Sequence, residues 1–183
     1  MQHPSPLDIL TQIAIHVPLW VWGVLALLIV IGRQQSRTQV VSRKRVMVLP
    51  LIWLVFGAWG VEKGFGQAGS AAAAMAAWAL GLVASVGGML AVGWPGGASY
   101  QTDSKHYVVP GSWLPLVVML LIFVSRFAIG MALGFQPALS HSLPFAVAAS
   151  LSYGLFSGFF LGRSINILRR GPSDRAAAVQ VAG

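Results

Sequence analysis

Residues 112–134 read SWLPLVVMLLIFVSRFAIGMALG, an apolar run with one charged side chain, Arg126. The hydrocarbon core of a bilayer is about 30 Å thick and takes roughly 20 helical residues to cross, so this run is long enough to span a membrane. Inside lipid a backbone must satisfy its own hydrogen bonds, which a helix does. The stretch therefore predicts a transmembrane helix with a guanidinium in its apolar part.

The composition of the whole chain favours the same class. Of 183 residues, 56% are hydrophobic and 9% are charged, whereas soluble domains carry about 25% charged residues. We predict an all-α integral membrane protein, a single transmembrane domain over residues 1–183 built as a bundle of about five helices. The expected spans are about 9–32, 46–61, 68–94, 112–134 and 145–162.

The positive charge is grouped. Five basic residues lie in the segment 33–45 and four follow the last span: Arg33, Arg37, Arg43, Lys44, Arg45, then Arg163, Arg169, Arg170 and Arg175. Short loops rich in Lys and Arg stay in the cytoplasm. With five spans, the N-terminus then lies outside and residues 163–183 form a basic cytoplasmic tail, flexible at its end. This grouping explains the net charge of +8 by membrane topology, so we expect no nucleic-acid partner.

Three ionisable residues interrupt the spans at a similar depth. At about 1.5 Å per residue from the cytoplasmic ends, Arg126 lies roughly 21 Å up, and Glu62 and His16 roughly 24 Å. A charge in hydrocarbon costs about 2.5–3.5 kcal/mol even on the mild insertion scale, so such residues usually face the bundle and pair. We expect Arg126 to pair with Glu62, with His16 and Gln12, one helical turn apart, adding hydrogen bonds. The alternative is that Arg126 snorkels to the outer headgroups and Glu62 marks a span end.

Glycines at four-residue spacing predict close helix packing. Helix association in lipid relies on small residues that let backbones approach. Gly154, Gly158 and Gly162 form such a series in the fifth span, and Gly130 with Gly134 forms another in the fourth. We expect packing within one bundle, with a dimer face as the alternative.

The sequence carries few signs of catalytic chemistry. The chain has no cysteine, which excludes thiol redox chemistry and disulfides. No motif of a nucleotide-binding loop, a metalloprotease or a serine hydrolase occurs, and the histidines lack metal-ligand spacing. We therefore expect no catalytic residue and no metal. His16 and His141 both lie on the expected outer side, which leaves open a b-haem held by two axial histidines.

Three stretches resemble a family of small bacterial inner-membrane proteins without assigned activity, loosely grouped with CcdC-like proteins. They are VPLWVWGVLALLIVIGRQ, VPGSWLPLVVMLLIFVSRFAIG and YGLFSGFFLGRSI. The matching positions are Pro110, Gly111, Ser112, Arg126, Phe127, Gly158 and Arg163. The resemblance implies a multi-span bundle in the bacterial inner membrane. It implies no catalytic roles, and a part in cytochrome maturation would need a thiol that this chain lacks.

These observations favour a non-enzymatic inner-membrane protein, an accessory or assembly partner that contacts the bilayer and another membrane protein or a second copy of itself. The first alternative is a small transporter or permeation subunit that uses the layer of His16, Glu62 and Arg126. The second is the b-haem electron carrier. Five spans do not divide into two equal inverted halves, which counts against a self-contained repeat transporter.

Overall fold

The computed structural model describes residues 18–66, 69–101 and 106–170. Within these ranges five α-helices account for most of the chain: α2 (Leu19–Gln35), α3 (Arg43–Phe65), α4 (Ala71–Val92), α5 (Leu114–Phe135) and α6 (Leu143–Arg169). Helices α3 to α6 are long and apolar enough to cross a membrane, whereas the described part of α2 is shorter. By length and composition this is a multi-span membrane protein.

The helix limits differ from the expected spans mainly at the ends. Helix α2 begins directly after Pro18, and the earlier part of the first expected span, residues 9–17, lies outside the described residues. Helix α6 continues past the expected end near Gly162 to Arg169. These last turns of α6 pack against the end of the bundle that starts α3: Ile167 is buried in a cluster with Val46 and Tyr107.

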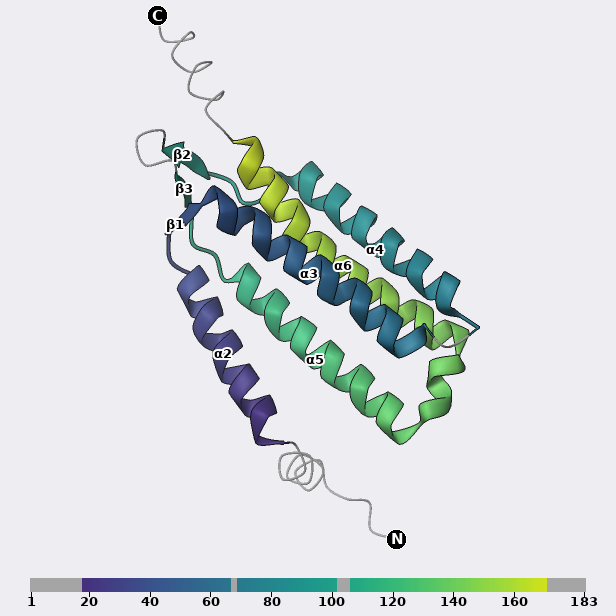
Figure 1. Ribbon diagram of the computed structural model, residues 1–183. Helices are drawn as coiled ribbons and strands as arrows, with labels where there is room; N and C mark the ends of the chain where they lie inside the picture. The colour runs from purple at the N-terminus through teal and green to yellow at the C-terminus, as the bar shows by residue number, and fades with distance from the viewer. Residues whose placement is uncertain (1–17, 67–68, 102–105, 171–183) are drawn as a thin grey trace, which may run out of the picture.

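Helix α6 occupies the centre of the bundle. It lies between α4 and α3, and α5 and α2 form a second pair along the other edge of α3 (Figure 1). Helix α6 packs most extensively on α4 and then on α3, while α5 packs on α2 and touches α6 only lightly. Outward-facing apolar side chains such as Leu80 and Val83, both 68% exposed, suit contact with lipid. The bundle therefore has a tight three-helix part and a looser two-helix part.

Glycines let α4 and α6 touch along their backbones. A Cβ at Gly154 would overlap the Trp78 carbonyl oxygen, and one at Gly158 would come within 2.5 Å of the Leu82 carbonyl oxygen. On the opposing helix, a Cβ at Gly81 would meet the Leu151 carbonyl at 2.5 Å. Any larger residue at these positions would push the two helices apart.

The connections at one end of the bundle form a small antiparallel sheet, so the all-α prediction must be corrected to mostly helical. Strands β1 (Gln39–Ser42), β2 (Ser99–Gln101) and β3 (His106–Val109) pair in the order β1-β3-β2. The strands are rich in Val and Tyr, which suit a pleated, half-buried surface. Each strand has only three or four residues, too short for an alternating pattern to stand out in the sequence.

The same end is tied to α4 and α6 by a buried amide. Asn166 Nδ2 donates to the carbonyl oxygens of Met89 (2.7 Å) and Trp94 (2.9 Å). The Met89 carbonyl also accepts from the Gly93 backbone N–H at 3.0 Å, so Asn166 adds a second hydrogen bond that joins α6 to the end of α4. Gly93 then turns the chain away in the left-handed conformation, φ 67°, which glycine adopts without steric cost.

Gly154→Ala should lower the free energy of unfolding in detergent by about 1–3 kcal/mol, the usual cost of overpacking a tight contact. The matched control is Gly130→Ala, because a Cβ at Gly130 meets nothing within 4 Å. The control should leave stability unchanged or raise it by up to about 1 kcal/mol, since alanine favours the helix. Equal melting temperatures for the two variants would contradict the close contact between α4 and α6.

Candidate functional site

Arg126 reaches across the seam between the two parts of the bundle. Its Nη2 donates to the Phe56 carbonyl oxygen of α3 at 2.8 Å. Its Cζ lies 4.3 Å from the centre of the Tyr153 ring of α6. A guanidinium over an aromatic face is worth more once both groups leave water. One side chain of α5 thus contacts both α3 and α6 at mid-height.

Glycine again makes the room for this contact. A Cβ at Gly60 would lie 2.7 Å from both Nη atoms of Arg126. Phe56 and Gly60 are four residues apart and share a helix face. The carbonyl and the space for the guanidinium therefore come from the same face of α3.

The expected ion pair between Arg126 and Glu62 is wrong: in the described part of the chain Arg126 contacts Phe56 and Tyr153, and no ion pair to Glu62 forms. Glu62 follows Gly60 by two positions, a rotation of about 200° on a helix. Its carboxylate therefore lies on the far side of α3 and is exposed. The snorkelling alternative stays a prediction, because Arg126 is only half-buried and its hydrogen bond to the Phe56 carbonyl lies in an exposed part of the bundle.

The remaining members of the expected polar layer, His16 and Gln12, lie outside the described residues. The layer that the structure describes consists of Arg126, the Phe56 carbonyl and the Tyr153 ring. His141, the other histidine considered for a haem, is exposed in the short 3-10 helix η1 (Pro137–His141). No group of three His, Asp or Glu that could hold a metal occurs among the described residues.

The glycine series fall into two groups. Gly154, Gly158 and Gly162 face α4, and at Gly162 a Cβ would come within 2.6 Å of the Met89 side chain. Gly130 and Gly134 on α5 are exposed and have nothing within 4 Å of an added Cβ. The series on α6 is thus filled within the chain and the series on α5 is left open.

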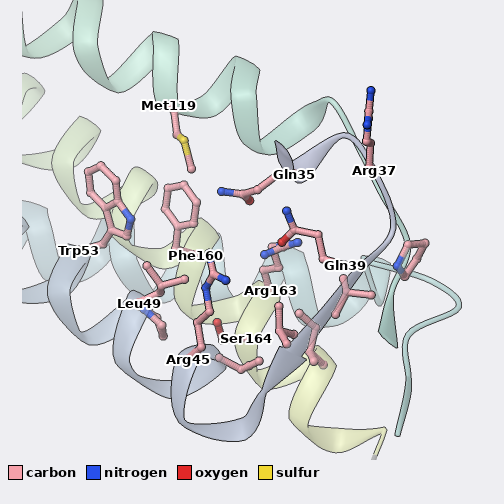
Figure 2. A pocket seen from close by; sticks show the side chains of 16 residues that line it. Gln35, Arg37, Gln39, Arg45, Leu49, Trp53, Met119, Phe160, Arg163 and Ser164 are labelled. Atoms are coloured by element: carbon pink, nitrogen blue, oxygen red, sulfur yellow. The ribbon is translucent and has the colours of Figure 1, made fainter. Parts of the chain in front are cut away.

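A second polar site lies at the end of the bundle that carries the sheet. A cavity of about 60 Å³ opens where the end of α2, strands β1 and β3 and helices α3, α5 and α6 meet. Figure 2 shows Gln35, Gln39 and Arg163 directed toward one another, with Arg37 pointing away. Arg45 reaches the same space from the first turn of α3. The polar part of the wall is therefore built from amides and guanidinium groups.

The deeper wall of this cavity is apolar. It is formed by Trp53, Met119 and Phe160 from three different helices. Trp53 and Phe160 stack with ring centroids 5.1 Å apart. The cavity thus runs from a basic mouth toward the apolar middle of the bundle.

Arg163 is the most confined basic group of this cavity. Its Nε is buried and has no hydrogen-bond partner in the described structure, while its Cζ lies 5.5 Å from the Trp94 ring centre. Buried polar atoms are usually hydrogen-bonded, and an unpaired one costs about 1–3 kcal/mol. Arg163 therefore retains unused donor capacity next to the cavity.

A family model described as a family of unknown function, DUF6622, matches residues 2–179. The chain belongs to the DUF6622 family. No curated protein and no solved structure matches it. Membership of DUF6622 assigns no activity.

In the sequence of this DUF6622 protein Arg126 stands out, whereas most of the residues around it do not. Gly60 and Tyr153 carry no signal by themselves, because glycine and tyrosine are common in membrane helices. The cavity at the basic end leaves no continuous signal in the sequence, because its walls come from six elements: α2, β1, α3, β3, α5 and α6. One signal was present: Arg163 and Asn166 are polar residues just beyond an apolar run, where a continuing helix would bury them.

A double-mutant cycle measures the Arg126 contact. Arg126→Met and Tyr153→Leu should show a coupling of about 1–2 kcal/mol in the free energy of unfolding, because each removes the other's partner. The control cycle pairs Arg126→Met with Glu62→Gln, whose effects should add to within about 0.5 kcal/mol. Equilibrium unfolding in mixed micelles supplies the values. Strong coupling to Glu62, with none to Tyr153, would restore the ion pair and overturn the contact described here.

Proposed function

We propose that this DUF6622 protein is a non-enzymatic accessory or assembly partner in the bacterial inner membrane, with its N-terminus outside and its C-terminus in the cytoplasm. The observation that carries the partner role is the open glycine face of α5, where Gly130 and Gly134 have no neighbour within the described chain. Small residues at this spacing allow another transmembrane helix to pack closely. The face suits a helix of a second protein or of a second copy.

The grouping of charge supports the orientation. Among the described residues, every Lys and Arg except Lys63 and Arg126 belongs to the end of α2, the first turn of α3, the segment between them or the end of α6. The sheet joins the two connections at this end, β1 to β3. Basic segments of this kind are retained in the cytoplasm. The resemblance to small bacterial inner-membrane proteins supports a location in the bacterial inner membrane.

The second candidate is a small transporter or permeation subunit, and Arg126 is the observation that favours it. The charge of Arg126 is met by a backbone carbonyl and a ring rather than by a carboxylate. Ionisable residues inside the membrane often mark ion or substrate paths. If the protein is a transporter, Arg126→Lys should abolish uptake of its substrate while the protein stays folded. An accessory role needs only the folded bundle, so the same substitution should leave that role intact.

Reporter fusions test the orientation. A reporter that works only in the cytoplasm should be active when fused after Arg170 and inactive when fused after Gly66, between α3 and α4. A periplasmic reporter should give the reverse pattern at both positions. The opposite result at both sites would invert the orientation, and equal activity at the two sites would contradict an odd number of spans between them.

Co-purification tests the partner role. The tagged protein, extracted in a mild detergent, should retain a second membrane protein or a second copy, and Gly130→Leu should reduce the retained amount severalfold. Gly88→Leu on α4 is the matched control, since a Cβ at Gly88 also meets nothing within 4 Å and α4 lies on the other side of α6 (Figure 1). Light scattering distinguishes self-association from a different partner. Recovery of a monomer alone, with and without the substitution, would refute this function.

A further inference from the structure

The cavity at the sheet-bearing end has the chemistry of an anion site. Arg45 and Arg163 line it together with the amides of Gln35 and Gln39, and all four side chains carry N–H donors. Gln39 Nε2 is engaged with the Gln34 carbonyl oxygen at 2.7 Å. The buried Nε of Arg163 has no partner in the described structure. An anion in the cavity would satisfy that donor.

Within the described residues, no carboxylate lies close enough to balance the positive charges of Arg45 and Arg163. Glu62 is the only Asp or Glu within the described residues, and it lies about 26 Å from Arg45 along α3 at 1.5 Å per residue. Exposed charges are largely screened beyond about 8 Å at physiological ionic strength. Glu62 therefore does not neutralise Arg45 or Arg163.

The size and the walls of the cavity limit the class of ligand that fits. A cavity of about 60 Å³ accommodates a group of a few heavy atoms. Guanidinium groups form two parallel hydrogen bonds with phosphate oxygens. Beyond the basic mouth the wall turns apolar, with Trp53, Met119 and Phe160. A phosphate group with an apolar chain attached matches both parts.

We propose that this cavity binds a phosphate group, with Arg45 and Arg163 as its cationic contacts and the Trp53–Phe160 wall receiving an attached apolar chain. The chemistry is shared by the headgroup of an anionic phospholipid and by a free phosphate. Basic pockets between transmembrane helices commonly bind lipid headgroups, and the apolar wall favours that source.

Arg45→Gln is the informative substitution. Arg45 is exposed and lies in the first turn of α3, where a positive charge opposes the helix dipole, so its removal should not unfold the protein. Arg43→Gln is the matched control, because Arg43 begins the same helix and is exposed but does not line the cavity. Both substitutions change the net charge equally. Arg163→Gln is a second test, read together with its melting temperature.

The experiment uses the full chain in two arms. In the first, native mass spectrometry counts phosphatidylglycerol and phosphatidylcholine retained by the detergent-solubilised protein. In the second, inorganic phosphate is titrated against the protein in phosphatidylcholine nanodiscs, with chloride at matched ionic strength, and the melting temperature is followed. We expect the protein to retain phosphatidylglycerol in preference to phosphatidylcholine. Arg45→Gln should weaken the binding of phosphatidylglycerol about tenfold, because it removes one charge-assisted hydrogen bond.

Each result decides the proposal. Lipid retention that Arg45→Gln weakens and Arg43→Gln leaves unchanged supports the site with a headgroup as its source. A phosphate-dependent rise in melting temperature with the same dependence on Arg45 supports the site with a free phosphate as its source. Equal losses in Arg45→Gln and Arg43→Gln indicate general surface attraction and overturn the proposal. Binding of neither ligand also overturns it.

Discussion

The close approach of α4 to α6 is the constraint on which the rest of the bundle depends. In lipid no hydrophobic force drives helices together, because the lipid tails are as apolar as the side chains. What remains is dispersion, about 0.1–0.2 kcal/mol for each atom pair, which accumulates only where surfaces meet without gaps. Gly81 on one helix and Gly154 and Gly158 on the other remove the side chains that would keep the backbones apart. Helix α6 can therefore serve as the central support for α3.

Arg126 compensates for weak packing on the other side of the bundle. Helix α5 touches α6 only lightly, yet its guanidinium bonds to α3 and stacks on Tyr153 of α6. A bond to a backbone carbonyl does not depend on a titratable partner, so this link should hold over a wide range of pH. The same feature leaves a positive charge within the bundle without a carboxylate, which is why a transport role remains the second candidate.

The sheet-bearing end joins segments that are far apart in the chain. Strand β1 precedes α3, β3 precedes α5, and Ile167 near the end of α6 packs in the same cluster as Val46 and Tyr107. Their union holds the two parts of the bundle in register and creates a cavity at the seam.

The sequence by itself determined the class of molecule and the general position of its helices, because crossing a bilayer requires long apolar runs and 1.5 Å per residue leaves little freedom in their length. It also marked Arg126 as unusual, since a charge inside such a run is costly. The partner of Arg126 was decided only by tertiary structure. Glu62 was the nearest acid by depth, but depth does not specify the rotation of a helix, and the face of α3 toward α5 presents Gly60 and the Phe56 carbonyl. The sheet and the cavity likewise arise from contacts between distant segments, each too short to carry a pattern of its own.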